Sequence, residues 1–456
     1  MASIGFVLEQ IKKDPSRALQ QLPVRQVCEE LGLQWRERCL DPATTVALFI
    51  QQILHGNRSC AAVRHLAEAS FSAQAYCRAR QRLPLEVIGR LSRRLVDAAV
   101  RQLRQKRSER FHGHRVFVVD GSTFSMPDTP ELQKEFGQPG MQRKGCGFPV
   151  AHLLAMFDLS SGLLMEAIAS PMRTHDLARI AQVHPLLREG DLLMGDTALG
   201  SWTHFALLLQ GKLHGLMPSH QCRIVDFTPR RAHVRQAEVD DSNRHRPRSR
   251  WIRSCGREDQ IVEWFKPKIR PRYMSKQDYG ALPDSIQVRE LRRRVKHPAT
   301  GRWVELTIVT TLLDPKQYPA DDLVELRLRR WQVEIDLRHL KTTMKMDVLK
   351  CKSVAGVQKE LAMFGLVYNL VRLLMLQAAS RQKVQADRIS FADVLAWAQC
   401  CSPGSTLPRF LINPVRHKRI EPRVIKRRRS NSYDIMNRPR EKLRKALKYQ
   451  AKKGGR

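Results

Sequence analysis

The sequence lacks three features that mark membrane or secreted proteins: a long apolar run, a signal peptide and paired cysteines. No uninterrupted apolar stretch approaches the roughly 20 residues that a transmembrane helix needs, so we expect no membrane anchor. The first residues have neither the basic start nor the long apolar centre of a signal peptide. We therefore expect a cytoplasmic protein.

Metal-ligand spacings are also missing. The 10 cysteines contain no Cys-x-x-Cys pair, and the 15 histidines show no His-Glu-x-x-His motif. These absences argue against a zinc site and against a disulfide framework. Reduced thiols, as in other cytosolic proteins, are the expectation.

Acidic residues are scarce. The chain has 44 Asp and Glu against 80 Lys and Arg, which gives a formal charge of +36. Such an excess favours a polyanionic partner, since each neutralised phosphate releases counterions. Nucleic acid is the expected partner, and an anionic membrane is a weaker alternative. The hydrophobic share of 42% suits a globular protein, and 456 residues are enough for more than one domain.

Apolar periodicity and composition predict five regions along the chain. Residues 1–108 have helical spacing and are predicted to form a helical DNA-binding region. Residues 109–214 alternate short apolar strands with helices, which is typical of an α/β sheet. Residues 215–315 are predicted to be a β-rich insertion, residues 316–380 return to helix, and residues 381–456 form a basic C-terminal region.

Two acids follow short strand-like apolar runs in the α/β part. Asp120 ends the run of residues 116–119, and Asp196 follows the run "LLM" at residues 192–194. Ligands bind at the carboxyl ends of strands in open α/β sheets, and carboxylates there can hold a hard cation such as Mg²⁺. Asp-Gly after a strand is also an ordinary turn signal, so this pattern alone leaves both interpretations open.

A third acid lies in the basic helical stretch "RLRRWQVEIDLRHLK", residues 327–341. At about 100° per residue, Glu334 lies nearly opposite Asp336. Four basic residues lie with Glu334 within one sector of roughly 80° around the helix axis: Arg327, Arg330, Arg338 and Lys341. One interpretation is that this sector is a solvated helix face with weak i,i+4 ion pairs. The other is that Glu334 faces a metal ion while the basic side chains hold phosphates.

Together, Asp120, Asp196 and Glu334 resemble the acids of the DDE transposases of bacterial insertion sequences, and most closely the type-four group. The signature of that group is Tyr, two residues, Arg, three residues, Glu, six residues, Lys. Arg330, Glu334 and Lys341 match it. Arg327 occupies the Tyr position, where it can still hold a phosphate but offers no ring.

The resemblance implies an α/β protein with an RNase H-like catalytic core, in two parts at 109–214 and 316–380. A β-rich insertion interrupts the core, and a helical N-terminal domain and a helical basic C-terminal region flank it. The implied activity is binding of the inverted-repeat ends of an insertion sequence, cleavage there, and joining of the 3′-hydroxyl ends to target DNA. Asp120, Asp196 and Glu334 would hold two Mg²⁺ ions, for which Mn²⁺ can substitute.

The resemblance also assigns DNA contacts and partners. Arg330 and Lys341 would clamp end phosphates, and Arg327 would join them. Trp303 is a candidate for stacking on a flipped base, and the alternative is a Trp packed under the insertion. A homodimer on two paired ends, in the bacterial cytoplasm and associated with the nucleoid, would be the working assembly.

Two alternatives remain at this stage. One is an RNase H-like metal-dependent nuclease without strand transfer. The other is a catalytically decayed relic that binds DNA ends but cannot cut them, which the departure at Arg327 leaves open.

Overall fold

The computed structural model describes residues 22–413 and a few positions between 439 and 449. The gaps within the first range are residues 68–69, 104–109, 141, 144, 175, 235–243, 297–302 and 402–404. About half of the predicted basic C-terminal region, and residues 1–21 of the predicted N-terminal region, therefore lie outside the described residues.

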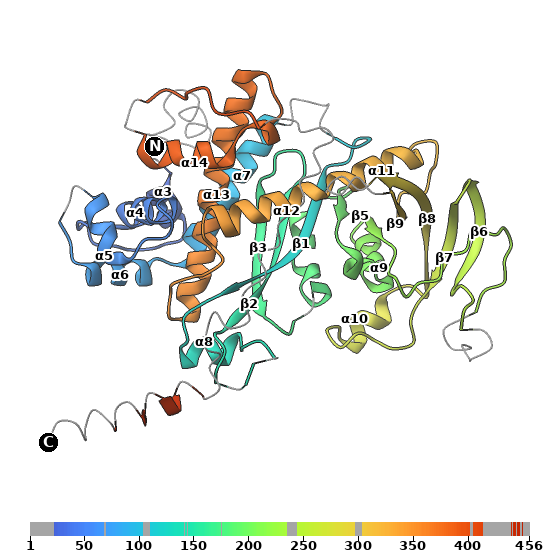
Figure 1. The fold of residues 1–456 in the computed structure, drawn as a ribbon, viewed down its shortest axis with the longest axis horizontal. Helices are drawn as coiled ribbons and strands as arrows, with labels where there is room; N and C mark the ends of the chain where they lie inside the picture. Colours follow the sequence, from blue (N-terminus) through green and yellow to red (C-terminus); the bar gives the residue numbers. More distant parts are fainter. Residues whose placement is uncertain are drawn as a thin grey trace.

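A nine-stranded mixed sheet forms the centre of the described chain (Figure 1), in the order β3-β2-β1-β4-β5-β9-β8-β7-β6. The strands are β1 Val116–Ser125, β2 Val150–Asp158, β3 Leu164–Pro171, β4 Leu192–Met194, β5 His214–Pro218, β6 Ser249–Gly256, β7 Asp259–Phe265, β8 Ser285–Lys296 and β9 Trp303–Thr310. Neighbours β1, β4 and β5 run parallel, and the other neighbouring pairs are antiparallel. The predicted α/β fold is confirmed at this level.

Helices cover both faces of the sheet. They are α3 Val24–Glu30, α4 Pro42–Leu54, α5 Cys60–Val63, α6 Ala73–Arg82, α7 Leu85–Leu103, α8 Pro130–Glu135, α9 Trp202–Gln210, α10 Lys276–Ala281, α11 Ala320–Arg329, α12 Trp331–Arg338, α13 Val354–Gln382 and α14 Phe391–Cys400. One core cluster joins α11, α12 and α13 to one face of β1, and a second joins α9 to the other face. Helices α3 to α6 lie at one end of the molecule and β6 to β9 at the other, with α11 and α12 crossing between them (Figure 1).

Local sequence explains the principal helices. Asp41 caps α4, where its side chain accepts a hydrogen bond from the Thr44 N–H, and Pro42 occupies the first turn. Helix α13 is long and apolar enough to cross a membrane, but 83% of its most apolar stretch is buried inside the protein. It is the core helix around which the N-terminal helices and the sheet pack.

The β-rich segment extends the same sheet. Strands β8 and β9 form the antiparallel hairpin that the sequence predicts, and β9 pairs with β5. Because β5 spans residue 215, the predicted start of the insertion falls inside a strand of the central sheet. Strands β6 to β9 therefore continue the core sheet.

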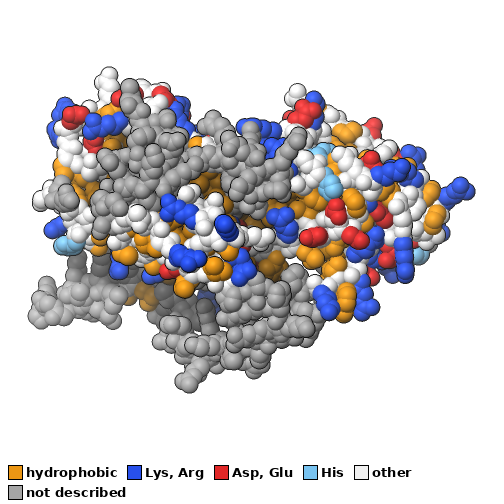
Figure 2. Space-filling view, turned by 90° about the horizontal axis from the view of Figure 1, so that it is seen from above, with side chains coloured by type: hydrophobic (Ala, Val, Ile, Leu, Met, Phe, Trp, Pro, Cys, Tyr) orange, Lys and Arg blue, Asp and Glu red, His pale blue; other side chains and the backbone are white. Residues whose placement is uncertain are grey.

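Charge alone does not locate a binding face. On the face seen in Figure 2, basic side chains are spread over the described surface and do not gather in one patch. The functional site must therefore be sought from particular side chains and their contacts.

A histidine pair, of which His204 is buried and His184 half-buried, supports the loop that follows β4. His204 on α9 has Nδ1 2.9 Å from the Leu199 carbonyl oxygen, so Nδ1 carries a proton and donates it. Its Nε2 then accepts from His184 Nε2 at 3.2 Å. Burial lowers the pKa of His204 to about 3 and that of His184 to about 4. Both rings are therefore neutral in the folded protein near neutral pH.

This pair predicts a loss of stability in acid. Below pH 6.5, the ordinary pKa of histidine, the unfolded chain takes up a proton at His204 that the folded protein does not. The free energy of unfolding should then fall by about 1.4 kcal/mol per pH unit at this residue. His204→Asn keeps an N–H for Leu199 and should flatten this part of the slope, measured by urea unfolding between about pH 7 and about pH 5. His65→Asn, at an exposed position, is the control, and equal slopes in all three proteins would contradict the expectation.

Candidate active site

Alternation along β1 directs Asp120 towards the helical layer that contains α12. Val118 and Phe124 belong to the core cluster shared with α11, α12 and α13, whereas Val119 belongs to the cluster on the opposite face. Successive side chains of a strand point to opposite faces, so the even-numbered positions of β1 face α12. Asp120 and Ser122 therefore lie on the face of the sheet that packs against α12.

The sequence placed Asp120 at the end of a strand, and this is wrong. Strand β1 continues to Ser125 because β2 pairs with it along residues 117–125. Strand β4 pairs only with residues 116–118, so β1 and β4 separate beyond that point. Asp196, in contrast, follows the end of β4 by two residues, as expected. Both acids thus lie just beyond the last β1–β4 pair.

The Asp196 carboxylate also shapes its own loop. Its Oδ1 accepts hydrogen bonds from the backbone N–H groups of Ala198, at 3.0 Å, and Leu199, at 3.3 Å. These bonds cap the short 3-10 helix Thr197–Leu199. No residue in the described part of the chain donates to Oδ2, which leaves one carboxylate oxygen available to a ligand.

Arg330 joins the strand acid to the helix acid. It stands at the junction of α11 and α12. Its Nη1 is 3.4 Å from Asp120 Oδ2, and its Nη2 is 2.8 Å from Glu334 Oε1. The Asp120 side chain is 18% exposed and the Glu334 side chain 40% exposed, so one edge of the pair opens to solvent. A single guanidinium therefore bridges two of the three acids.

The charges of all three acids influence the pKa of Arg327. Burial and the neighbouring charge of Arg330 lower its pKa to about 10, and the charges of Asp196, Asp120 and Glu334 oppose that shift. Such interactions require the three carboxylates to lie near one guanidinium. All three acids that the sequence singled out thus act on Arg327, but direct side-chain contacts join only Asp120 and Glu334, through Arg330.

Crowding of like charges is visible at Asp120. Burial raises the pKa of its carboxyl, and the charges of Asp196 and Glu334 raise it further. Arg330 and the Gly121 N–H act in the opposite direction. Asp120 is thus a partly buried acid whose ionised form depends on nearby positive charge.

Lys341 reaches the same face of β1 from the far end of the helix. Helix α12 passes into a π-helical turn, His339–Thr343, and Lys341 Nζ donates to Ser122 Oγ at 2.7 Å. Burial lowers the pKa of Lys341. The sequence grouped Arg338 with Arg327, Arg330 and Lys341. Its side chain is exposed, so for Arg338 the alternative of a solvated helix face is correct. Ser122 was missed, although its position two residues after Asp120 places it on the same face.

Trp303 lies elsewhere. It opens β9, which is separated from β1 by β4 and β5 in the sheet. Its side chain is 56% exposed, so the alternative of a Trp packed under the insertion is wrong. The Arg294 guanidinium lies 5.6 Å and the Lys296 ammonium 5.3 Å from its ring centre. The result is an exposed ring flanked by two cations.

A buried ion pair anchors α12 from behind. Asp336, 2% exposed, faces away from Glu334, and its Oδ1 lies 3.9 Å from Arg372 Nη1 of α13. Arg372 also donates to Asp387 Oδ1 at 2.7 Å and to the Ser161 carbonyl at 2.6 Å. The sequence contained a signal for this anchor, because an arginine inside an apolar helical run needs a buried partner.

Whether the acids can hold a metal ion depends on Arg330. Carboxylate oxygens are the ligands that Mg²⁺ prefers, and here three carboxylates lie near two arginines. Among the described residues, however, no three Asp, Glu, His or Cys side chains are grouped closely enough to hold an ion in this arrangement. The guanidinium of Arg330 lies between Asp120 and Glu334. The acids therefore fit a divalent cation in charge and ligand type but not in spacing, so cation binding would require Arg330 to withdraw and the three carboxylates to move closer together.

Comparisons with known proteins point to one family. Residues 111–370, which include all three acids, match the family model described as "Transposase DDE domain". The transposase InsG for insertion sequence element IS4 of Escherichia coli (strain K12) is 24% identical over 366 residues, covering 74% of this chain and 75% of that protein. The putative transposase InsZ of the same organism is 23% identical over 213 residues, covering 45% of this chain and 65% of that protein.

A solved structure is also similar in outline. The cryo-EM structure of a piggyBac transposase synaptic complex with hairpin DNA has a TM-score of 0.40 and 10% sequence identity. The similarity covers 88% of this chain and 80% of that chain, but a score this low supports no argument of its own.

Two substitutions of Asp196 separate its loop-forming role from its charge. Both Asp196→Asn and Asp196→Ala remove the charge, but only Asn retains an oxygen for the Ala198 and Leu199 N–H groups. The Ala variant should therefore be less stable than the Asn variant by about 1 kcal/mol, measured by denaturant unfolding. Equal stability of the two variants would mean that the cap does not support the loop.

Proposed function

Because the chain belongs to the family of transposases with a DDE domain, we propose that it binds the inverted-repeat ends of an insertion sequence, cleaves them and joins the 3′-hydroxyl ends to target DNA. The observation that carries the proposal is the shared setting of Asp120, Asp196 and Glu334 around Arg327 and Arg330. Asp120 lies in β1, Asp196 follows β4 by two residues and Glu334 lies in α12, and all three fall within the residues that match the family.

Asp120, Asp196 and Glu334 would hold two Mg²⁺ ions, or Mn²⁺ in their place. Such ions lower the pKa of a bound water or hydroxyl and stabilise charge on a leaving phosphodiester oxygen. The carboxylates supply the negative charge for this, with Asp120 partly buried, Glu334 at the open edge and Asp196 held by its loop. The anchor of Asp336 on Arg372 holds the helix that presents Glu334.

Arg330 is proposed to exchange partners during binding. In the structure it donates to Asp120 and Glu334. A divalent cation at these acids would compete with it, and a DNA phosphate would offer it a new bidentate partner. Arg327 and Lys341 would hold neighbouring phosphates, so Arg327 would fill the place of the family Tyr as a cation without a stacking ring.

Several features support the remaining parts of the proposal. The strand order β3-β2-β1-β4-β5, with β2 antiparallel to both its neighbours, supports an RNase H-like core that β6 to β9 extend. The exposed ring of Trp303 supports base stacking by that extension. The N-terminal helices would add DNA contacts. The working form would be a homodimer on two paired ends in the bacterial cytoplasm, associated with the nucleoid.

Removing any one acid should abolish cleavage without abolishing binding. Asp120→Asn, Asp196→Asn and Glu334→Gln keep side-chain size, and each should reduce divalent-cation-dependent cleavage of inverted-repeat DNA by about 100-fold or more. Binding to the same DNA should stay within about twofold of the unmodified protein, since the phosphates are contacted by basic side chains and not by these acids. Glu325→Gln, an exposed acid on α11, is the control.

The products decide between the alternatives. Joined strand-transfer products support transposition, and cuts without joining would instead support a simple nuclease. End binding without any cutting by the unmodified protein would indicate a decayed relic. Full cleavage by any one of the three acid variants would remove that residue from the site.

Arg330 should oppose cation binding in the absence of DNA. Arg330→Gln removes the competing guanidinium, so Mn²⁺ should bind the DNA-free protein about tenfold more tightly, measured by titration calorimetry. The same variant should cleave DNA poorly, because a phosphate contact is lost. Arg338→Gln removes an equal charge from an exposed position of α12 and is the matched control. Mn²⁺ affinity no higher than that of the control would contradict the proposed exchange.

A further inference from the structure

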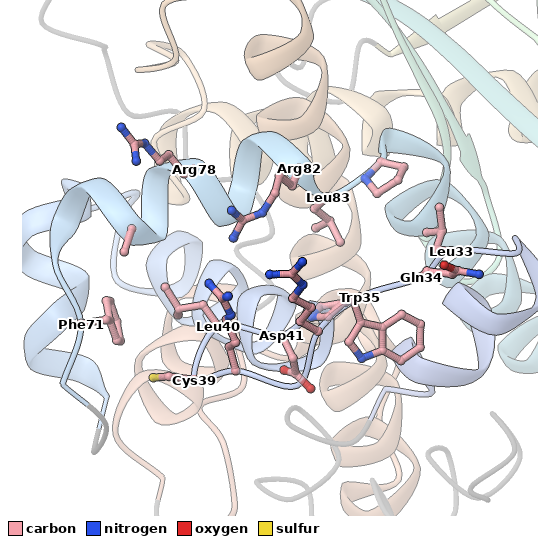
Figure 3. Close-up of a pocket in the computed structure, with 15 residues that line it drawn as sticks. Leu33, Gln34, Trp35, Cys39, Leu40, Asp41, Phe71, Arg78, Arg82 and Leu83 are labelled. Atoms are coloured by element: carbon pink, nitrogen blue, oxygen red, sulfur yellow. The ribbon is translucent and has the colours of Figure 1, made fainter.

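A cavity of about 640 Å³ lies in the N-terminal helical region (Figure 3), and none of the three acids lines it. Its walls come from the irregular segment 33–42, from Phe71 and from α6 with the residues that follow it. The volume lies in the range of about 300–1,000 Å³ that is usual for small-ligand sites. A cavity of this size can take a single nucleotide but cannot enclose a duplex.

The walls are largely apolar and include two aromatic rings. Leu33, Leu40 and Leu83 line the cavity together with Trp35 and Phe71. Trp35 and Phe71 are half-buried, and they lie at opposite ends of the cavity in Figure 3. Flat rings at the edge of an apolar pocket offer stacking faces to another flat, partly polar ring.

The cavity is also positively charged. Four arginines line it: Arg36, Arg38, Arg78 and Arg82. No hydrogen bond or ion pair joins the side chain of any of them to another described residue. Arg78 and Arg82 are four residues apart on α6, and the Arg82 side chain reaches into the space between α6 and segment 33–42 (Figure 3). A ligand with an anionic group would meet several cations there.

The one acid in the lining does not cancel this charge. Asp41 Oδ1 accepts from the Thr44 N–H at 2.7 Å, and Asp41 Oδ2 pairs with Arg25 at 3.0 Å. Its negative charge is therefore directed at the start of α4 and at another arginine. The four lining arginines keep a net positive field at the cavity.

The cavity is built on a helix that is fixed to the core. On the inner side of α6, the Tyr76 hydroxyl donates to Gln52 Oε1 at 2.9 Å, and Arg80 Nη2 lies 3.1 Å from Cys351 Sγ. Cys351 follows the segment in which the Leu349 N–H bonds to the Ser125 carbonyl at the end of β1. The helix that presents Arg78 and Arg82 is thus connected to the strand that carries Asp120.

We propose that this cavity binds one unpaired nucleotide of a DNA strand, with the base between the apolar walls and aromatic rings and the phosphate on the arginines. The choice of DNA as the source rests on the proposed function. An unpaired base exposes the ring face and the edges that a paired and stacked base hides. Arginine combines phosphate binding with ring stacking, which suits a nucleotide better than a purely anionic ligand.

The test uses the full-length protein and a DNA duplex with 2-aminopurine as a single-nucleotide bulge, compared with the same duplex in which that base is paired. The bulged probe should bind about tenfold more tightly. Its fluorescence should fall on binding, because the base stacks on an aromatic ring. Arg38→Gln combined with Arg82→Gln should remove most of this preference, and Trp35→Leu should remove most of the fluorescence change.

Arg64→Gln, at an exposed position outside the cavity, is the matched control. Equal binding of the bulged and paired probes, or cavity variants that behave like Arg64→Gln, would overturn the proposal. A poly-glutamate peptide that displaced the probe better than single-stranded DNA would also overturn it, in favour of an acidic peptide ligand.

The outcome is separable from the proposed function. Asp120→Asn should bind the bulged probe as the unmodified protein does, because the cavity does not include the acids. If bulge preference persists in a protein that never joins DNA ends, the transposase proposal fails and the nucleotide site stands. If end joining proceeds without any bulge preference, the nucleotide site fails alone.

Discussion

Three carboxylates cannot be brought together in a partly buried site unless positive charge accompanies them. Here that charge is the guanidinium of Arg330, which contacts both Asp120 and Glu334, with Arg327 beside it. Burial and the charges of the two other acids raise the pKa of Asp120, and Arg330 acts against that shift. In the structure, guanidinium groups therefore supply the positive charge beside these acids, and the proposed Mg²⁺ ions would have to replace Arg330 at Asp120 and Glu334.

The surrounding fold serves to hold this arrangement in place. The end of the β1–β4 pairing sets the positions of Asp120 and Asp196, and α12, which carries Glu334, packs on β1. The helix is fixed at its rear by the ion pair of Asp336 with Arg372, and the turn that follows it is joined to β1 by Lys341 and Ser122. Contacts on two sides of this short helix hold in place the backbone that carries Glu334.

The sequence correctly predicted the features that depend on residues close together in the chain. Helical spacing correctly placed Arg330 and Glu334 on one edge with Asp336 facing away, and the apolar run before Asp196 correctly indicated a strand. The position of Asp120 was missed because β2, a partner distant in sequence, prolongs β1 past it. The exposure of Trp303 and the cavity beside α6 depend on how separate segments assemble, which no local pattern records.

The central claim is that Asp120, Asp196 and Glu334 meet at one cation site. Bound Fe²⁺ with peroxide generates hydroxyl radicals that cut the backbone close to the ion, and mass spectrometry locates the cuts. The account predicts cuts near Asp120, Asp196 and Glu334 together, all suppressed by excess Mg²⁺. Cuts near one of these residues only, or at positions remote from all three, would contradict it.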